Sequence, residues 1–539
     1  MTGPNPPRHL TVAGNGIVSS ASPRAAAVGL RVLQGGGNAF DAAIATASIE
    51  WLTLPGSCGL GGDMFAVLYD AKSGRIKGIN GSGVAGSKAT YERYTAGGAN
   101  GMPLDGWHAA AVPGAAHAYA TLNREFGTRP LSELLATAID YAENGVVACD
   151  NVAGAISGSA GKLGKFSYSA AQYLPKGKAP ALGERWLVPD LARSIRTLAE
   201  EGAESFYKGA IAKEMVRASD EDDGPFTLDD FARHETEIYD PPTTRYRDVD
   251  VYTTAPPSQG LINLLWLNIL EGFDLRGAGF GTADAIHLMV EAKKRAFADR
   301  LRYLADPRFN DNPIDSLLSK SFAERRRATI DPARASDSQT AGDLSDGDTS
   351  YFCVADGDGN AISFIHSLSA GFGSGVVAGS TGIILNNRAG RGFSLDPDHI
   401  NVVAPGKKTM HTLNCYMLAR DGRPWVVGGT PGGDRQPQWN VQAITAMIDF
   451  EMNVREAVDS PSWISWPGTD PAAIDTPLSL RIEEGFGDDV IADLESRGHR
   501  IDRHQDWSLG SKHQLIALDG NGILTGASDP RYSGGALGY

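Results

Sequence analysis

The chain changes its secondary-structure pattern once, and this change limits its fold more than any other feature of the sequence. Helical patterns dominate the first part, whereas short strand patterns follow one another after Thr349. Between the two parts lies an acidic segment, Ala335 to Asp348, with the composition of a flexible linker. Helices gathered in one part and strands in the other favour an α+β, layered fold over a regularly alternating parallel sheet.

Several elements can be placed within these parts. The run from Ala39 to Leu54 is apolar nearly all round, which is typical of a helix buried between layers. An amphipathic helix is expected from Ile286 to Leu304, where apolar residues recur at helical spacing. Strands are expected at residues 65–69, 351–355, 361–366, 381–385, 415–419, 425–427 and 514–518.

Thr349 stands directly after the acidic segment and directly before a strand that has the composition of core. A self-cleaving precursor would expose a new N-terminal nucleophile at such a place. The Thr349 hydroxyl would attack the preceding carbonyl, and hydrolysis of the ester would free an α-amino group with a pKa of roughly 7.7 to 8.0. That amine can serve as the base that a threonine nucleophile needs. The alternative is that Thr349 simply opens a hairpin.

Composition excludes several classes of protein. The 539 residues contain 49 Lys and Arg against 64 Asp and Glu, a net charge of −15, whereas nucleic-acid binding needs clustered positive charge. Neither Met1 to Arg8 nor any later run is apolar enough for a signal peptide or a membrane span. We therefore expect a cytoplasmic protein with no nucleic-acid or membrane partner. The four cysteines lie far apart and are expected to be buried thiols.

No cofactor or metal is expected. The run from Asp356 to Asn360 imitates the start of a calcium loop, but it lacks the required Gly and the closing Glu, so a hairpin turn is favoured. His287 and Glu291 share a helix face, yet a second His of a zinc motif is missing.

A series of short motifs, in order along almost the whole chain, resembles the γ-glutamyltranspeptidase family of N-terminal nucleophile hydrolases. Each motif is weak by itself, and their common order is specific. The motifs are Gly35-Gly36-Gly37-Asn38-Ala39-Phe40-Asp41, Gly59-Leu60-Gly61-Gly62-Asp63, Val112-Pro113-Gly114, Pro256-Pro257-Ser258-Gln259-Gly260, Phe372-Gly373-Ser374-Gly375, Leu385-Asn386-Asn387, Pro431-Gly432-Gly433 and Gly526-Ala527-Ser528-Asp529-Pro530-Arg531.

The resemblance implies a four-layer αββα sandwich and cleavage between Asp348 and Thr349. Residues 1–348 would form a large subunit and 349–539 a small one, together one catalytic unit made from a single precursor. Thr349 then matches the nucleophile and Ser367 the hydroxyl that orients it. Gly432 and Gly433 match the backbone amides of the oxyanion hole.

The positions that bind the glutamyl group in the family differ here. Ser82 stands where the family has the arginine that grips the α-carboxylate, and His411-Thr412 where it has a serine pair. Ser369 replaces an asparagine. The family has an acidic residue that binds the α-amino group of the substrate. The matching run here, Arg388-Ala389-Gly390-Arg391, has no acidic residue and is basic instead. The predicted substrate-binding residues are Ser82, Ser369, Asn387, Arg388, His411, Thr412, Asp434 and Arg435.

Arg388, Arg391, Arg435 and His411 are the candidates for holding an acid group of the substrate, with a structural ion pair as the alternative for each. The run that begins at Gly432 resembles a divergent branch of the family that includes oxamate amidohydrolase and cephalosporin acylase-like proteins.

The sequence predicts an autoprocessing threonine amidohydrolase that acts on a small-molecule amide and favours hydrolysis over transfer. A true γ-glutamyltransferase or glutathione hydrolase is one alternative. A non-catalytic binding protein that keeps the fold is another, because Ser350 and Tyr351 replace the usual neighbours of the nucleophile. Assembly of the heterodimer into a higher homo-oligomer stays open.

Overall fold

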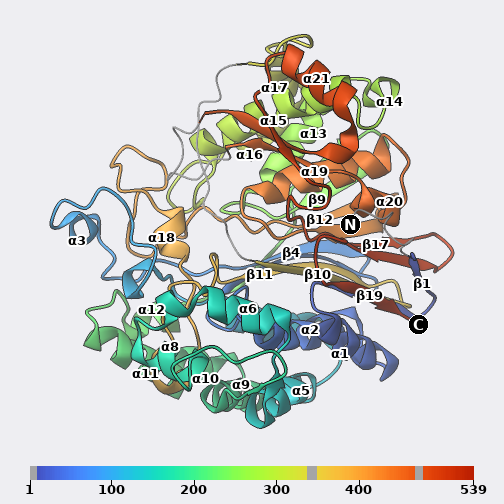
Figure 1. Ribbon diagram of the computed structural model, residues 1–539. Helices are drawn as coiled ribbons and strands as arrows, with labels where there is room; N and C mark the ends of the chain where they lie inside the picture. Colours follow the sequence, from blue (N-terminus) through green and yellow to red (C-terminus); the bar gives the residue numbers. More distant parts are fainter. Residues whose placement is uncertain (1–8, 337–348, 468–476) are drawn as a thin grey trace.

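The computed structural model describes residues 9–336, 349–467 and 477–539, and most strands in these ranges belong to two stacked seven-stranded sheets (Figure 1). Sheet A contains, in spatial order, β1 (Thr11–Ala13), β18 (Leu524–Ser528), β17 (Gln514–Leu518), β13 (Arg423–Gly429), β12 (Tyr416–Arg420), β9 (Val249–Thr253) and β8 (Thr243–Tyr246). Sheet B contains β19 (Gly535–Gly538), β2 (Gly16–Ser20), β10 (Ser350–Asp356), β11 (Ala361–Ser367), β3 (Asp63–Asp70), β4 (Arg75–Gly81) and β7 (Glu237–Tyr239).

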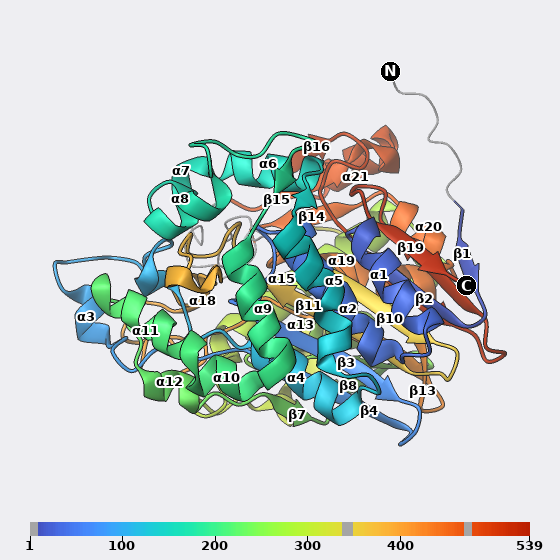
Figure 2. The same ribbon diagram turned by 90° about the horizontal axis from the view of Figure 1, so that it is seen from below.

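Helices cover the outer face of each sheet. The layer on sheet B, seen from below in Figure 2, contains α1 (Pro23–Gln34), α2 (Ala39–Thr53), α4 (Ala115–Phe126), α5 (Leu131–Asn144), α6 (Asp150–Gly158), α7 (Ala160–Leu163), α8 (Ser167–Tyr173), α9 (Pro189–Glu201), α10 (Ala203–Lys208), α11 (Ala210–Glu221) and α12 (Leu228–Ala232). The layer on sheet A contains α13 (Leu261–Leu270), α14 (Leu275–Ala278), α15 (Ala283–Tyr303), α16 (Ile314–Leu318), α17 (Lys320–Arg327), α19 (Arg435–Ile448), α20 (Val454–Asp459) and α21 (Asp488–Ser496).

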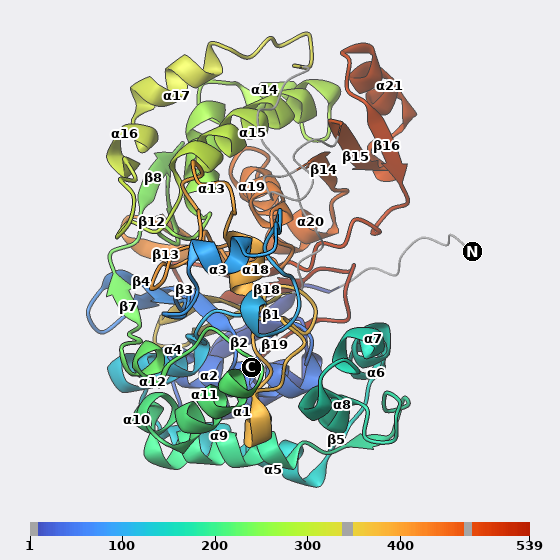
Figure 3. The ribbon, with the colours of Figure 1, turned by 90° about the vertical axis from the view of Figure 1, so that its left-hand side faces the viewer.

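Smaller elements complete the described chain. Figure 3 shows the four layers from the side, with α3 (Tyr91–Thr95) and α18 (Arg388–Gly392) near the level of the sheets. The minor sheets contain β5 (Val146–Val147) with β6 (Arg185–Trp186), and β14 (Trp463–Trp466), β15 (Ser479–Glu483) and β16 (Ile501–His504). The 3₁₀ turns are η1 (Trp107–Ala109), η2 (Gly379–Thr381) and η4 (Glu484–Phe486).

The alternation of side chains along a strand explains how the central strands serve two cores at once. In β10, Tyr351, Cys353 and Ala355 pack between the two sheets. Phe352 and Val354, the residues in between, pack against the helical layer that includes α2. Because both faces of β10 are apolar, this strand can only lie inside a layered structure, as its sequence predicted.

Most predicted elements are confirmed, and one is wrong. The all-round apolar helix is α2, and the hairpin after Thr349 is formed by β10 and β11. Residues 381–385 were expected to form a strand, but the chain forms η2 and isolated bridges there. The cause is a turn against α9. Gly382 has φ +69, and a Cβ at this glycine would lie 2.2 Å from the Leu191 backbone nitrogen.

Helix α15 is less amphipathic than expected, because charged side chains on its other faces are buried as well. Lys293 is fully buried and donates hydrogen bonds from Nζ to the carbonyls of Ser465 and Pro467, both at 2.8 Å. Glu291 is also buried and pairs with Lys294 at 2.7 Å. These charged residues of α15 therefore make internal contacts and do not form a solvent-exposed face.

Three of the four cysteines, Cys58, Cys353 and Cys415, are buried as predicted, Cys149 is only partly buried, and no disulfide joins any two of the four. Of the predicted linker, residues 337–348 lie outside the described chain. No helix within the described ranges combines the length and the apolar character needed to cross a bilayer.

Candidate active site

Thr349 and Ser367 lie together at one end of the β10–β11 hairpin. Their hydroxyl oxygens are 3.1 Å apart, and either can be the donor. Both side chains are buried, Thr349 with 3% exposure. Ser367 Oγ also accepts a hydrogen bond from the Ser369 backbone N–H at 2.7 Å, so its position is fixed by the loop that follows. The structure thus brings the predicted nucleophile and its predicted partner into contact.

The strand register extends this contact into a row across sheet B. Ser350 pairs with His366, His366 with Met64, and Ser367 with Asp63. Ser350 and His366 point to the helical layer, where both contact Glu50 of α2, so the residues one step along each strand point to the space between the sheets. Thr349, Ser367 and Asp63 therefore form a row on the face that looks toward sheet A.

Gly432 and Gly433 lie beyond the end of β13, which faces the start of β10. A Cβ at Gly429, the last residue of β13, would lie 2.6 Å from the Tyr351 ring, so the two strand ends meet. Both glycines have positive φ, +134 and +58. Their carbonyls accept hydrogen bonds from Arg435 N at 3.0 Å and Gln436 N at 3.2 Å. Within the described residues neither glycine N–H donates a hydrogen bond, which leaves both for a ligand.

A buried cluster of charge surrounds Asp63. Its Oδ2 accepts from Arg388 Nε at 3.3 Å and lies 3.0 Å from His411 Nε2, while Oδ1 accepts from the Gly83 N–H at 3.2 Å. His411 Nδ1 accepts from the Leu413 N–H at 3.3 Å, which makes Nε2 the protonated nitrogen that donates to Asp63. Three of the predicted substrate-binding residues, Arg388, His411 and Thr412, are joined here, because Arg388 Nη1 donates to Thr412 Oγ1 at 3.2 Å.

Burial and neighbouring charges set the protonation of this cluster. Burial lowers the pKa of Arg388 to about 10, so the guanidinium remains charged at pH 7. Burial, followed by the Arg388 charge, lowers the pKa of His411 to about 4, so the ring is neutral. Burial opposes ionisation of Asp63, but His411 and Arg388 outweigh it and hold the pKa of Asp63 below its usual range.

Acid should weaken the fold through His411. Its pKa is about 4 in the folded chain and roughly 6.5 when unfolded, so its contribution is complete above pH 6.5 and declines as the pH falls toward 4. We expect the free energy of unfolding to lose about 2 kcal/mol from this residue between pH 7 and pH 5. Urea unfolding at a series of pH values measures the slope. In His411→Gln, the loss of unfolding free energy between pH 7 and pH 5 should be smaller by about 2 kcal/mol. An unchanged pH dependence would contradict the assignment of this loss to His411.

Ser82 does not supply a charge in place of the family's arginine. Its hydroxyl donates to Asn80 Oδ1 at 2.6 Å, and Asn80 in turn donates to Glu237 Oε2 at 2.8 Å. Ser82 follows β4 on the same edge of sheet B as Asp63. It therefore extends the row of Thr349, Ser367 and Asp63 with a neutral side chain.

The remaining predicted substrate-binding residues divide into two groups. Asn387 stays close to the nucleophile, because its N–H donates to the Leu368 carbonyl at 3.1 Å and its Oδ1 accepts from Ala370 N at 3.0 Å. Asp434 forms a buried ion pair with Arg300. Arg435 lies 5.4 Å from the centre of the Trp439 ring. The last two have structural contacts, and Asp348 lies outside the described residues.

A second polar network lies on the other face of the same strands, below the nucleophile. Glu50 of α2 accepts hydrogen bonds from Ser20 Oγ and Ser350 Oγ, both at 2.6 Å, and lies 2.7 Å from His366 Nε2. His366 Nδ1 lies 2.9 Å from the Tyr119 hydroxyl. Ser350 directly follows Thr349 in the chain, and His366 directly precedes Ser367. The network therefore supports the backbone of both.

This network is also the place where the described residues could hold a metal ion. Ligand atoms of Glu50, Cys58 and His366 lie within 4.8 Å of one another. Glu50 and His366 are already hydrogen-bonded to each other. A metal would have to replace that bond inside a fully buried site, so the hydrogen-bonded form accounts for the geometry without one.

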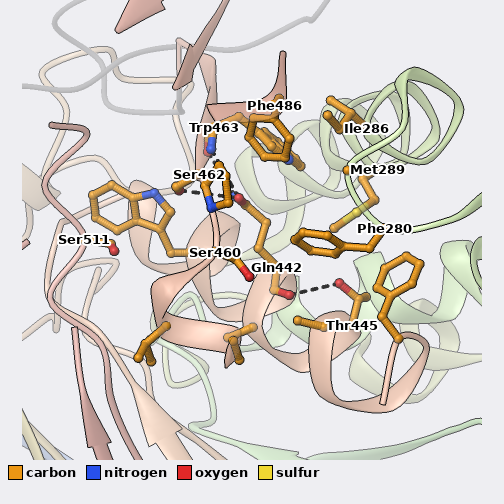
Figure 4. Close-up of a pocket in the computed structure, with 18 of the residues that line it drawn as sticks. Phe280, Ile286, Met289, Gln442, Thr445, Ser460, Ser462, Trp463, Phe486 and Ser511 are labelled. Atoms are coloured by element: carbon orange, nitrogen blue, oxygen red, sulfur yellow. Dashed lines mark hydrogen bonds between the residues drawn. The ribbon is translucent and has the colours of Figure 1, made fainter. Parts of the chain in front are cut away.

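An apolar pocket lies between α15, α19 and β14 (Figure 4). Phe280, Met289, Trp463 and Phe486 are among the residues that line it. Trp439 also borders the pocket, and a Cβ at Gly432 would lie 2.5 Å from its ring. The pocket therefore lies behind the Gly432 turn and contains none of the predicted site residues.

Three residues of the site were not predicted. Asp63 ends a glycine motif, and only the strand register reveals that it faces Ser367. Glu50 carried a signal that could have been used, since it is a glutamate near the end of a helix that is apolar nearly all round. His366 precedes Ser367 in a strand and is fully buried.

Comparison with known proteins agrees with this architecture. The family model described as Gamma-glutamyltranspeptidase matches residues 25–539. The chain is 38% identical over 525 residues to the glutathione hydrolase-like YwrD proenzyme of Bacillus subtilis, covering 97% of this chain and 98% of that protein. It is 35% identical over 539 residues to the oxamate amidohydrolase proenzyme of Klebsiella pneumoniae, with coverage of 98% and 99%. The crystal structure of cephalosporin acylase from Bacillus halodurans aligns with a TM-score of 0.91 at 35% identity, covering 100% of this chain and 98% of that one.

The four layers and these matches define an N-terminal nucleophile amidohydrolase, an enzyme that transfers an acyl group from an amide to water or an amine. The αββα sandwich predicted from the sequence is confirmed. The chain belongs to the gamma-glutamyltranspeptidase family.

Proposed function

We propose that the chain is an autoprocessing amidohydrolase whose nucleophile is Thr349 Oγ1 and which favours hydrolysis over transfer. The observation that carries this proposal is the 3.1 Å contact between the hydroxyls of Thr349 and Ser367 at the start of a central strand. The names of relatives support it, since they include an oxamate amidohydrolase proenzyme and a cephalosporin acylase. Cleavage before Thr349 would give subunits 1–348 and 349–539, which would remain together as a heterodimer.

The chemistry uses groups of the chain alone. In the precursor, Thr349 Oγ1 attacks the carbonyl of the preceding residue and the peptide C–N bond breaks, which frees the Thr349 amine. Water then hydrolyses the resulting ester, which releases the new C-terminal carboxylate and restores the Thr349 hydroxyl. In turnover the same oxygen attacks the substrate amide, and the leaving amine takes the proton. The backbone amides of Gly432 and Gly433 would stabilise the oxyanion. Water then attacks the acyl-enzyme, releases the acid and restores the hydroxyl.

The intact mass of the purified protein tests this proposal. Two polypeptides are expected in place of one of 56.9 kDa, with the smaller one beginning at Thr349. A single uncut chain without amidase activity would refute the enzyme and favour the non-catalytic alternative. The predicted cytoplasmic location and the state of assembly beyond the heterodimer stay predictions from the sequence.

A true glutathione hydrolase is the second candidate, and one observation favours it: a glutathione hydrolase-like protein is 38% identical over nearly the whole chain. Against it stands the neutral hydroxyl of Ser82 at the position of the family's carboxylate-binding arginine. Comparison of γ-glutamyl anilide with other acyl anilides, each with and without an acceptor dipeptide, separates the two candidates. Efficient γ-glutamyl transfer would favour the second.

Gly432→Ala is expected to lower kcat for amide hydrolysis by roughly 10²- to 10³-fold, the usual effect of losing an oxyanion donor. Gly432 has φ +134, and its new Cβ would lie 2.5 Å from the Trp439 ring, so the turn must shift. Steady-state kinetics on a chromogenic anilide measures the change. Gly422→Ala is the matched control, because Gly422 also has positive φ (+75) but open space around it. Equal effects of the two substitutions would contradict the oxyanion role.

A further inference from the structure

Ser336, the last described residue before the proposed cleavage site, has all of its polar groups bound by helix α15. Its N–H donates to Glu291 Oε1 at 3.2 Å, and its hydroxyl donates to Glu291 Oε2 at 2.7 Å. Its carbonyl accepts from Lys294 Nζ at 2.9 Å, and its hydroxyl oxygen accepts from Arg295 Nη1 at 3.2 Å. Three charged side chains from about one turn of a helix thus hold a single serine. We call Glu291, Lys294 and Arg295 the Ser336 clamp.

The charges of the Ser336 clamp are paired with one another. Glu291 lies 2.7 Å from Lys294 Nζ and 2.5 Å from Arg295 Nη1, and Glu291 and Lys294 are buried. Burial opposes ionisation of Glu291, but the Lys294 charge and the other partners outweigh it and hold the pKa of Glu291 below its usual range. The carboxylate is therefore ionised at pH 7, and both of its hydrogen bonds to Ser336 are charge-assisted.

The residues before Ser336 are bound in the same region. His287 Nε2 of α15 lies 2.8 Å from the Asp331 carbonyl. The Ala335 N–H donates to the carbonyl of Arg497, which follows α21, at 2.8 Å. The path of the chain is thus fixed by hydrogen bonds up to Ser336.

Stability alone does not account for a buried ionic cluster of this kind. Apolar residues of similar volume often make a protein as stable or more stable, because buried ions lose their hydration. Charge-assisted hydrogen bonds, in contrast, fix the position of each atom that they bind. Twelve residues, 337–348, separate Ser336 from Thr349, which is itself fixed at the start of β10. The clamp therefore sets one of the two fixed points between which the bond to be cut lies.

We propose that Glu291, Lys294 and Arg295 are positioning residues for self-cleavage, which direct the chain toward the bond between Asp348 and Thr349 by holding Ser336. They take no part in turnover of the cleaved enzyme. This inference rests on the proposed function, because it presupposes a cut before Thr349.

The size of the effect separates a directing clamp from a simple tether. If the fixed point moved back from Ser336 to Asp331, the segment before Thr349 would lengthen from 12 residues to 17, namely 332–348. Loop-closure entropy changes slowly with length, so a tether alone would slow cleavage by less than about 2-fold. A hydrogen bond to a charged group shifts an equilibrium by roughly 10-fold or more. A directing clamp should therefore have the larger effect.

The rate of self-cleavage tests the inference. Full-length chains are made in a cell-free system, synthesis is stopped, and the loss of the 56.9 kDa chain is followed by denaturing electrophoresis. Glu291→Gln keeps the side-chain volume but replaces the ionised acceptor, and it should slow cleavage by roughly 10-fold. Ser336→Ala leaves the backbone contacts in place and should slow it by roughly 3-fold. A slowing of about 2-fold or less in Glu291→Gln would overturn the inference.

Turnover by the cleaved fraction separates positioning from general damage. Anilide hydrolysis is divided by the amount of protein that begins at Thr349. On this scale, kcat of Glu291→Gln should stay within about 2-fold of the unsubstituted enzyme. Equal losses in cleavage rate and in kcat would overturn the inference, because a distorted fold would affect both.

Asp449→Asn is the matched control. Asp449 is buried like Glu291 and also accepts from an arginine and a hydroxyl, Arg247 Nε at 3.0 Å and the Tyr246 hydroxyl at 2.6 Å. Both substitutions convert a buried carboxylate into an amide, so both should lower the urea midpoint in the Thr349→Ala background. Only Glu291→Gln should slow cleavage. Equal slowing by both would overturn the inference, since lost stability would then explain it.

Failure of the proposed function gives a different result. An unsubstituted chain that stays uncut, or that is cut at another bond, refutes the proposed function and the inference with it. An unsubstituted chain that is cut before Thr349, with Glu291→Gln cut at the same rate, overturns the inference alone.

Discussion

Thr349→Ala is expected to leave the purified protein as one chain of 56.9 kDa without amidase activity. The substitution removes the oxygen that would attack both the preceding carbonyl and the substrate. Removing the nucleophile of a serine hydrolase lowers kcat by about 10⁶-fold, and here the loss of cleavage would also keep the α-amine blocked. Denaturing electrophoresis reports the cleavage, and anilide hydrolysis reports the activity.

Thr349→Ser is the matched control for that substitution. It keeps a hydroxyl at the same position, opposite Ser367 Oγ, and should be cut and retain measurable activity. If Thr349→Ala were still cut between residues 348 and 349, or still hydrolysed anilides at more than a trace, another residue would be the nucleophile.

Glu50→Ala is expected to lower the free energy of unfolding by about 3 to 5 kcal/mol, the usual effect of breaking a buried polar network on one side. The carboxyl group of Glu50 is fully buried and is bonded to Ser20, Ser350 and His366. Alanine would remove the shared carboxylate partner from all three and open a cavity. Urea unfolding measures the change, in the Thr349→Ala background so that a single chain unfolds.

Two further substitutions define the origin of that loss. Glu50→Gln keeps the volume and one acceptor oxygen, so its effect should be smaller, about 1 to 3 kcal/mol. Glu201→Ala, at the exposed end of α9, should change stability by about 0.5 kcal/mol or less. A loss for Glu50→Ala no larger than that of Glu201→Ala would mean that the network contributes little.

Features that depend on local pattern were predictable from the sequence. The all-round apolar helix α2, the hairpin after Thr349 and the buried strand β10 follow from side-chain periodicity and turn residues. The placement of Thr349 beside Ser367 could be predicted as well, but through the order of family motifs and not through periodicity.

Features that depend on contacts between distant segments were not predictable. Asp63 and His411 are 348 positions apart, and Glu50 and His366 are 316 apart. Neither pair leaves a local pattern, since the two partners of each pair lie in segments far apart in the chain. The buried charges of α15 were not predictable for the same reason, because the carbonyls that accept from Lys293 belong to Ser465 of β14 and to Pro467.

Both sheets interleave strands from the two sides of Thr349. In sheet B, β10 and β11 lie between β2 and β3, and in sheet A, β18, β17, β13 and β12 lie between β1 and β9. In a cleaved molecule, neither of the two seven-stranded sheets would therefore belong to one subunit alone. If the chain is cut before Thr349 as proposed, folding would have to be complete first, and a cleaved protein that is later denatured would have to refold as a bimolecular reaction. Its recovery would depend on protein concentration, whereas that of the uncut variant would not.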